Sequence, residues 1–427
     1  MKLWQKGAAA HEKVDHFTVG KDREYDLVLA QYDCQASSAH AKMLVKIGLI
    51  RPEEAEQLVA VLTEIQQQAE AGTFTIEKEF EDMHSKIEHV LTERLGDLGK
   101  KIHTARSRND QVLVAMHLYI KHELGAIKTQ VTALFDLLLS LAEKHQNELM
   151  PGYTHLQVAM PSSFGLWFSA YAESLIDDLY FWQSAHKIAD QNPLGSAAGY
   201  GSAFPIDRDF TTKALDFSQL KINSVAAQMS RGKLEKSTAM ALSAIGSTLA
   251  KFSMDVCLYM GQDFNFISFP DNLTTGSSIM PHKKNPDLFE LVRGKCNSVQ
   301  ALPNQLALLT TNLPSGYHRE LQLAKGPIID AIQEIKGCLE ILLFSLPKIQ
   351  VAKDSTTQKK YDYLFSVDTL NQEVLAGKPF RDAYRDLGNA IEKGEYQPNR
   401  EVKHTHLGSI GNLGLEQIRE KIKPFLS

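Results

Sequence analysis

The run TTGSSIMPHKKNPDLFE, at residues 274–290, combines hydroxyl groups, cations and a helix start in one short segment. Asn285 is a favoured N-cap residue and Pro286 a favoured first helical residue, so a helix is predicted to begin here. The preceding loop would then lie at the positive end of a helix, beside Lys283 and Lys284. Such a loop is suited to binding an anion.

A serine in this loop, Ser277 or Ser278, could act as a base. The neighbouring positive charges favour the alkoxide form of a hydroxyl group, which could then remove a proton from a weak carbon acid. Gly276, before the two serines, would let the loop close over a substrate and exclude water. The alternative interpretation of the same composition is a surface loop followed by a capped helix.

A second polar stretch, KKIHTARSRNDQV at residues 100–112, precedes the longest helical pattern of the chain. Arg106 and Arg108 flank a serine, and Asn109 and Asp110 follow directly. Guanidinium groups at a helix N-terminus can bind a carboxylate through two parallel hydrogen bonds. The stretch is therefore a candidate carboxylate site, or else a solvated helix cap.

Three further segments carry polar residues that could take part in catalysis or binding. Thr154-His155 lies in a connection bounded by prolines, PGYTHLQVAMPSSFG at residues 151–165, where an imidazole could transfer a proton. His84 and Glu88 are one helical turn apart, but their spacing is not that of a zinc-binding HExxH pair, so no metal site is predicted. The segment SGYHRELQLAKGP, at residues 315–327, could recognise polar substrate groups through Tyr317, Gln322 and Lys325. Each of these residues could instead be structural.

The elements that must position these residues are predicted to be helices. From Asp110, a plausible cap, apolar residues recur every three or four positions, which predicts one helix of roughly 35–40 residues. Further helices are predicted over residues 51–72 and 226–262 and around 287–310 and 327–345, whereas the alternation typical of strands is almost absent. Long helices with several apolar faces need mutual burial, which a bundle supplies. We therefore predict an all-α protein whose central long-helix bundle is shared between subunits of a homo-oligomer.

The composition excludes several classes of partner. The net charge is −5 and no basic block is present, which argues against nucleic acid binding. The longest apolar runs are expected to fall short of a membrane span, and the start of the chain lacks a signal-peptide core. Cys34, Cys257, Cys296 and Cys338 follow neither a metal-ligand nor a disulfide pattern. These features predict a cytoplasmic protein.

Taken together, the motifs resemble the fumarase/aspartase superfamily, whose signature GSSxMPxKxNP is matched by GSSIMPHKKNP at residues 276–286. Within it the chain resembles the argininosuccinate lyase family. The features of that family recur in order over nearly the whole chain as KLW, EDMH, HTARSRNDQ, GYTHLQ, PIDRD, GSSIMPHKKNPDLFE, YHRELQLAK and PFRDAY. The segments RSRNDQ and YTHLQ and the lysine pair favour this branch over fumarases, aspartases and adenylosuccinate lyases.

The resemblance implies cleavage of argininosuccinate to fumarate and arginine, in arginine biosynthesis, with no metal and no organic cofactor. It implies that Ser277 is the base and His155 the acid at the leaving guanidino nitrogen, although the opposite assignment stays open. Lys283 and Asn285 would hold the carboxylate and the developing negative charge, and Glu290 would be the charge partner of His155. Such charge must be stabilised, because proton removal produces a doubly negative carbanion.

The substrate contacts are also carried over by resemblance, residue by residue. Arg108, Asn109 and Thr154 match contacts to substrate carboxylates; Tyr317, Gln322 and Lys325 match contacts to the other end of the substrate; and His84 matches a supporting active-site histidine. The family forms each active site where three subunits of a homotetramer meet. We predict three helical domains, an N-terminal one over residues 1–107, the central long-helix bundle over 108–353 and a small C-terminal one over 354–427.

The chain also departs from the family pattern. Its start reads KLWQKGA without the usual Gly-Gly-Arg, Gly20 stands where a serine commonly contacts substrate, and Tyr384 replaces a histidine in PFRDAY. Two alternative functions are a sister lyase acting on another succinyl-amine and a structural homologue that has lost catalysis. The RSRNDQ segment argues against the first, and the intact Ser277, His155, Lys283 and Glu290 argue against the second.

Overall fold

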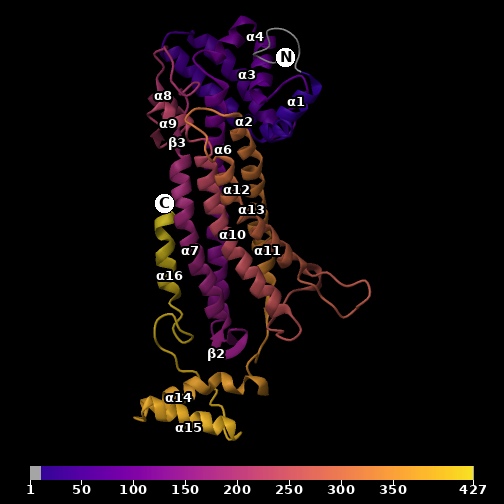
Figure 1. Cartoon of the computed structure of the whole chain (residues 1–427), viewed down its shortest axis with the longest axis vertical. Coiled ribbons are helices and arrows are strands. Elements are labelled where there is room, and N and C mark those ends of the chain that lie inside the picture. The colour runs from indigo at the N-terminus through magenta and orange to yellow at the C-terminus, as the bar shows by residue number, and fades with distance from the viewer. Residues whose placement is uncertain (1–10, 427) are drawn as a thin grey trace. The chain divides into compact units, whose positions relative to one another are not determined.

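The computed structural model describes residues 11–426, so the KLW segment lies outside the described residues. This part of the chain is mostly helical (Figure 1). Its α-helices are α1 (Glu12–Val19), α2 (Asp22–Lys46), α3 (Pro52–Glu70), α4 (Met83–Leu95), α5 (Asp97–Lys100), α6 (Arg108–Lys144), α7 (Phe164–Ala189), α8 (Arg208–Ala214), α9 (Ser224–Gln228), α10 (Lys233–Met260), α11 (Asp287–Val299), α12 (Leu302–Leu309), α13 (Lys325–Ser345), α14 (Ser366–Leu375), α15 (Phe380–Glu392) and α16 (Leu415–Ile422). The predicted all-α fold, built on long helices, is confirmed.

Three small sheets of two strands each accompany the helices. The strands are β1 (Leu149–Thr154), β2 (Gln157–Ser163), β3 (Gln191–Asn192), β4 (Gln219–Leu220), β5 (Ile267–Ser268) and β6 (Gln350–Val351). β1 pairs with β2 and β5 with β6 in antiparallel fashion, whereas β3 and β4 are parallel. Only the β1–β2 hairpin has strands longer than two residues among the described residues.

The chain forms two compact units that alternate along the sequence. Unit 1 comprises Met1–Lys128, Tyr180–Ala244 and Ser298–Ile335, and unit 2 comprises Thr129–Leu179, Ile245–Asn297 and Lys336–Ser427. Helices α6, α7, α10, α11 and α13 contribute residues to both units. The division into three domains, over residues 1–107, 108–353 and 354–427, stays a prediction.

In unit 1, the paired helices α2 and α3 show how the sequence specifies the core. α3 begins with Pro52 at its first position, and the Glu54 carboxylate accepts a hydrogen bond from the Arg51 N–H at 2.7 Å. Its buried residues Leu58, Leu62 and Ile65 recur every three or four positions and so form one face. Each such buried side chain contributes about 1.5–3 kcal/mol to stability.

In unit 2, an aromatic cluster joins α7 to α10. The rings of Trp167 and Phe252 are stacked with 5.3 Å between centroids, and Tyr171 meets Phe252 edge-on. The Trp167 indole and the Tyr171 hydroxyl both donate to Asp255, at 3.0 and 2.6 Å, so the polar atoms of the cluster are satisfied.

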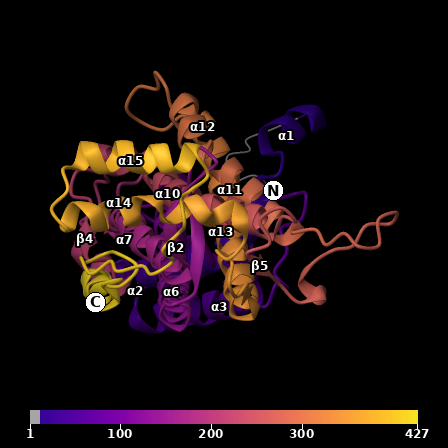
Figure 2. The ribbon, with the colours of Figure 1, turned by 90° about the horizontal axis from the view of Figure 1, so that it is seen from below.

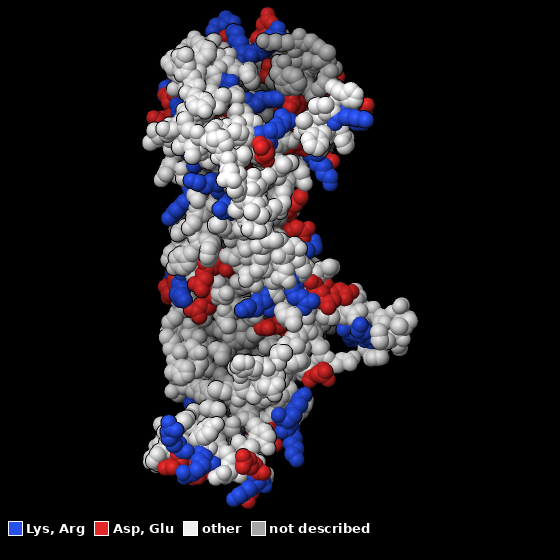
Figure 3. Space-filling model, in the orientation of Figure 1, with Lys and Arg blue, Asp and Glu red and all other residues white. Residues whose placement is uncertain are grey.

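The C-terminal part of unit 2 contains the neighbouring helices α14 and α15 (Figure 2). On the face shown in Figure 3, basic and acidic side chains lie close together in this part of the chain. Ion pairs such as Lys378 with Glu373 and Asp386, at 2.8 and 2.9 Å, account for part of this pattern.

The lengths of the predicted helices are confirmed in part. α6 has 37 residues, as expected. The helix predicted over residues 226–262 is instead split into α9 and α10, because Gly232 adopts a left-handed φ of 80° between them. The stretch around 287–310 likewise forms α11 and α12, since Pro303 cannot donate the hydrogen bond that would continue one helix.

The connection at residues 151–165 was expected to be a loop, but most of it forms the β1–β2 hairpin. Pro151 pairs with Pro161 in the register, and Thr154 pairs with Gln157 across a two-residue turn. Prolines normally argue against paired strands, which is why the sequence pattern did not predict the hairpin.

Two helices do not fit the expectation that the apolar runs of the chain fall short of a membrane span. By length and composition alone, α6 and α10 could each cross a membrane. The core helix of a helical bundle passes the same test, because its apolar faces are covered by neighbouring helices rather than by lipid. In the most apolar window of each helix, 44% of α6 and 56% of α10 is already buried within the chain.

Candidate active site

A pocket of about 210 Å³ in unit 1 gathers six of the predicted site residues. It lies among the start of α2, the start of α4, the start of α6 and the 3-10 helix Arg319–Ala324 that leads into α13. The predicted residues that line it are His84, Arg108, Asn109, Tyr317, Gln322 and Lys325. Segments more than 200 residues apart in the sequence thus meet in one cavity.

The start of α6 is fixed by a reciprocal cap. The Asp110 carboxylate accepts from the Ser107 N–H at 2.9 Å, and the Ser107 hydroxyl accepts from the Asn109 N–H at 3.3 Å. Asp110 therefore occupies the first turn of α6 rather than the N-cap position predicted for it. Its other oxygen accepts from the N–H groups of Gly195 and Ala197, at 3.0 and 3.1 Å. This arrangement ties the segment before α8 to the helix that carries Arg108.

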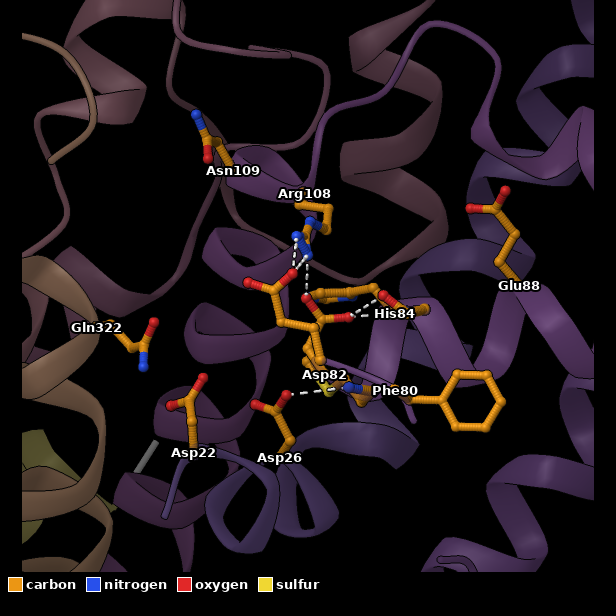
Figure 4. Close-up of polar contacts among 12 residues, drawn as sticks. Asp22, Asp26, Phe80, Asp82, His84, Glu88, Arg108, Asn109 and Gln322 are labelled. Atoms are coloured by element: carbon orange, nitrogen blue, oxygen red, sulfur yellow. Dashed lines mark hydrogen bonds and ion pairs between the residues drawn. The ribbon is translucent and has the colours of Figure 1, made fainter. Parts of the chain in front are cut away.

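Arg108 is held by two carboxylates at the start of α4 (Figure 4). Its guanidinium donates to Glu81 at 2.9 and 3.0 Å and to Asp82 at 2.8 Å. Arg319 donates to the other oxygen of Glu81, at 3.1 and 3.2 Å. A group predicted to bind a substrate carboxylate is thus paired here with carboxylates of the protein itself.

Lys325 lies at the bottom of the pocket with its side chain 3% exposed. Its ammonium contacts Asp22 at 2.8 Å and Asp26 at 2.5 Å. Burial by itself would lower the pKa of Lys325, but these two carboxylates raise it above the ordinary value. Asp26 also accepts from the Met83 N–H at 3.0 Å and so links α2 to the first turn of α4.

His84 is buried, and its Nδ1 lies 3.0 Å from Asp33. Burial alone would lower its pKa, whereas Asp33, followed by Asp82 and Asp26, raises it. Glu88, one turn further along α4, points away from His84 and pairs with His103 at 3.4 Å (Figure 4). The two residues singled out in this segment therefore do not form a joint site.

His155 and Thr154 belong to unit 2 and are exposed on the β1–β2 hairpin. His155 and Leu156 form its two-residue turn, and both have left-handed φ values, 55° and 57°. This conformation matches the twist of the paired strands, but it is unfavourable for residues with a Cβ atom. Such local strain is common at functional sites. The hairpin presents the imidazole at its tip.

The loop that carries Ser277, at residues 274–286 of unit 2, projects from between β5 and α11 (Figure 1). The Ser277 hydroxyl accepts from the Ile279 and Met280 N–H groups, at 3.3 and 3.1 Å, which folds the tip of the loop. At its base, Asn285 pairs with Thr275 through backbone hydrogen bonds of 2.8 and 3.3 Å. Asn285 was predicted to cap the helix, but it lies outside α11 and the Pro286 carbonyl accepts the first helical bonds instead.

Lys283 and Glu290, the remaining predicted residues, are exposed, on this loop and on α11. The hairpin and the loop lie apart in both views of the chain (Figures 1 and 2). One chain therefore gathers the six predicted site residues of unit 1 in a pocket, but it does not bring Ser277 beside His155.

The pocket also contains charged residues that the sequence analysis did not single out: Asp22, Asp26, Glu81, Asp82, Arg231 and Arg319. Some signals for them exist in the sequence. Asp22 and Asp26 are four residues apart and so share one face of α2, and Glu81-Asp82 directly precedes the start of α4. Within residues 11–426, no group of three or more His, Cys, Asp or Glu side chains could hold a metal ion.

Comparison with known proteins places this geometry in a family. Residues 10–301 match the family model described as lyase. Two solved structures share the fold. The structure of EDDS lyase in complex with formate has a TM-score of 0.74 and 20% sequence identity, and the match covers 98% of this chain and 90% of that one. The structure of class II fumarase from Schistosoma mansoni has a TM-score of 0.73 and 16% sequence identity, and the match covers 94% of this chain and 90% of that one. Fold and family match together define a helical lyase of the fumarase/aspartase superfamily.

Sequence identity is higher with one branch of that superfamily. The argininosuccinate lyase of Parabacteroides distasonis is 52% identical over 98% of this chain and 94% of its own length. The argininosuccinate lyase of Phocaeicola vulgatus is 50% identical over 99% and 95%. The chain belongs to the argininosuccinate lyase family.

Proposed function

We propose that the protein cleaves argininosuccinate to fumarate and L-arginine, in arginine biosynthesis. The observation that carries the proposal is the pocket of unit 1, where Arg108, Asn109, Tyr317, Gln322 and Lys325 converge. Its cations suit the carboxylates of such a substrate, and its amide and hydroxyl groups suit the polar amino-acid end.

In the proposed mechanism, Ser277 removes a proton from the carbon next to the one that carries the leaving nitrogen. The electrons of that C–H bond form the double bond of fumarate, and those of the broken C–N bond go to the guanidino nitrogen. His155, with Glu290 as its charge partner, supplies a proton to this nitrogen. The opposite assignment of base and acid to Ser277 and His155 is the second version of the same mechanism.

Lys283 and Asn285 stabilise the charge that develops on the substrate carboxylate. Arg108, Asn109 and Thr154 bind the carboxylates, Tyr317, Gln322 and Lys325 bind the other end, and His84 supports the site. Folding of the loop tip around Ser277 and the strained turn at His155 support these assignments, because both place a reactive group at the end of a projecting element. The chemistry requires no metal and no organic cofactor.

The complete site is proposed to form in a homotetramer, from residues of several subunits, in the cytoplasm. The wide separation of the hairpin and the loop within one chain supports shared sites. The four free cysteines are compatible with a reducing compartment. Nucleic acid and membrane are not expected as partners.

Replacement of the proposed base tests the function. We expect Ser277→Ala to lower the rate of fumarate release from argininosuccinate by about 10²- to 10⁴-fold, because proton transfer by a positioned side chain contributes this much. Ser278→Ala, a change of equal size in the next residue, serves as the matched control and should retain turnover. Circular dichroism would verify that both variants fold. Wild-type turnover of Ser277→Ala would contradict the assigned role.

A further inference from the structure

Four carboxylates line the pocket of unit 1, and three of them are fully engaged by the protein. In each of these three, both oxygens accept from a protein group: Asp26 from Lys325 and Met83, Asp82 from Arg108 and Ser85, and Glu81 from Arg108 and Arg319. Such saturated carboxylates have little capacity left for a ligand. Their role is to hold the cations and the first turn of α4 in place.

Asp22, in the first turn of α2, differs from the other three. Its Oδ1 contacts the Lys325 ammonium at 2.8 Å, but no donor among residues 11–426 lies within hydrogen-bond distance of Oδ2. The side chain is only 15% exposed and faces the pocket (Figure 4). Burial raises the pKa of Asp22, an effect that Lys325 opposes. A carboxylate oxygen that opens into the pocket without a protein donor can accept a hydrogen bond from a cationic ligand.

Gln322 supplies a second acceptor in the same cavity. Its amide nitrogen donates to the Thr18 carbonyl at 3.0 Å, which leaves the amide oxygen for a ligand. Arg108 and Arg319 provide donors elsewhere in the pocket. The cavity therefore has acceptors for a positive group and donors for a negative one, the pattern that recognises a zwitterionic amino acid.

We propose that Asp22 binds the α-ammonium group at the arginine end of the substrate, with the Gln322 amide oxygen beside it. Asp22 thereby selects substrates and products that carry a free α-amino group. The inference deepens the proposed function and rests on it for the identity of the substrate. A charge-assisted hydrogen bond of this kind is stronger than a neutral one and depends on the carboxylate being ionised.

Replacement of Asp22 by asparagine tests the proposal, because the variant keeps the size of the side chain and removes its charge. We expect the KM for argininosuccinate and the inhibition constant of L-arginine to rise about 10- to 100-fold, as for a hydrogen bond to a charged group, with kcat changed far less. Agmatine keeps the amino group but lacks the carboxylate, and its inhibition constant should rise in the variant to a similar degree. The inhibition constant of 5-guanidinopentanoate, which lacks the amino group, should stay the same in wild type and variant.

Glu53→Gln is the matched control. It removes an exposed acidic residue from the first turn of α3, as Asp22→Asn does from α2, but outside the pocket. Its kinetic constants should equal those of the wild type. Asp22→Glu, which keeps the charge, should restore part of the affinity for L-arginine.

Two results would overturn the role of Asp22. One is an equal loss of L-arginine and 5-guanidinopentanoate binding in Asp22→Asn, which indicates a merely structural role. The other is unchanged affinity for both compounds. These results differ from a failure of the proposed function, in which the wild-type protein itself would release no fumarate from argininosuccinate. Calorimetric titration of L-arginine and 5-guanidinopentanoate into wild type and variant would still decide the role of Asp22 in that case.

Discussion

At the scale of single residues, the pocket of unit 1 is a nearly balanced set of charges. Four carboxylates face Arg108, Arg231, Arg319 and Lys325 in a cavity of about 210 Å³. Because Arg108 is paired with Glu81 and Asp82, the substrate carboxylate that it is proposed to bind would have to replace these partners or join them. Breaking one partner out of a buried ion pair is costly, whereas exchange of one carboxylate for another is nearly balanced. The internal pairs thus keep the guanidinium of Arg108 in one orientation for its proposed role.

The buried pair of His84 and Asp33 makes stability depend on pH. Asp33 and its neighbours outweigh burial and raise the pKa of His84 above 6.5 in the folded protein. A histidine with a raised folded pKa contributes stability that is complete below the unfolded pKa, about 6.5, and is lost as the pH rises through the folded pKa. We therefore expect the thermal midpoint of the wild type to be higher than that of His84→Gln. The difference should be largest at about pH 6 and should decrease as the pH rises.

The same series with His89→Gln provides the control for the His84 prediction. His89 is on the same helix, α4, but its side chain is 40% exposed, so its ion pair with Glu93 contributes little. The difference between wild type and His89→Gln should be small throughout. A difference for His84→Gln that stays constant or grows between about pH 6 and 9 would contradict the raised pKa.

At the scale of elements, local patterns predicted most of the helices and missed what depends on distant partners. The apolar period of α6 is long enough to be unambiguous. The β1–β2 hairpin was not predicted because its strands contain Pro151 and Pro161. In addition, neither strand has a clear strand pattern in its own sequence, so each depends on pairing with the other. The break at Gly232 was missed because a glycine inside a helical pattern does not by itself show which φ it will adopt.

The first turn of α6 depends on one buried side chain. Asp110 is fully buried, and its two oxygens accept from three backbone N–H groups, those of Ser107, Gly195 and Ala197. In Asp110→Asn, an amide NH₂ group replaces one of the two accepting oxygens and faces backbone N–H groups, with which it cannot form a hydrogen bond. We expect destabilisation by about 1–3 kcal/mol, the cost of leaving buried groups unpaired, measured as a lower thermal midpoint.

Because the cap of α6 positions Arg108, Asp110→Asn should also weaken substrate binding. Asp97→Asn is the control, since the Asp97 side chain is 93% exposed and its ion pair within residues 11–426 is with Lys100, at 2.7 Å. It should leave both the thermal midpoint and the KM unchanged. An Asp110→Asn protein as stable as Asp97→Asn would show that the cap does not hold the start of α6.

At the scale of the whole molecule, the twelve predicted site residues divide evenly between the two units. His84, Arg108, Asn109, Tyr317, Gln322 and Lys325 belong to unit 1, and Thr154, His155, Ser277, Lys283, Asn285 and Glu290 belong to unit 2. Sequence motifs identified these residues without showing how they meet, because motif spacing along one chain does not report contacts between chains. The six in unit 1 could be checked within one chain, and they share a pocket. We propose that the other six join them only in the homo-oligomer.

Shared sites predict that two inactive variants restore activity when they assemble together. Suppose that Ser277 and Lys325 reach a site from different chains and that the two variant chains assemble at random in equal amounts. Each residue of a site is then intact with a probability of one half, so about a quarter of the sites have both residues intact and the mixture has about a quarter of wild-type activity. Co-expression of Ser277→Ala with Lys325→Gln should reach this level, whereas each variant alone should be nearly inactive. Co-expression of Ser277→Ala with Lys283→Ala is the control and should restore nothing, because both changes lie in the same loop and every copy of that loop is damaged. Activity absent from both mixtures would mean that Ser277 and Lys325 act from one chain, and the proposed sharing of sites between subunits would then be wrong.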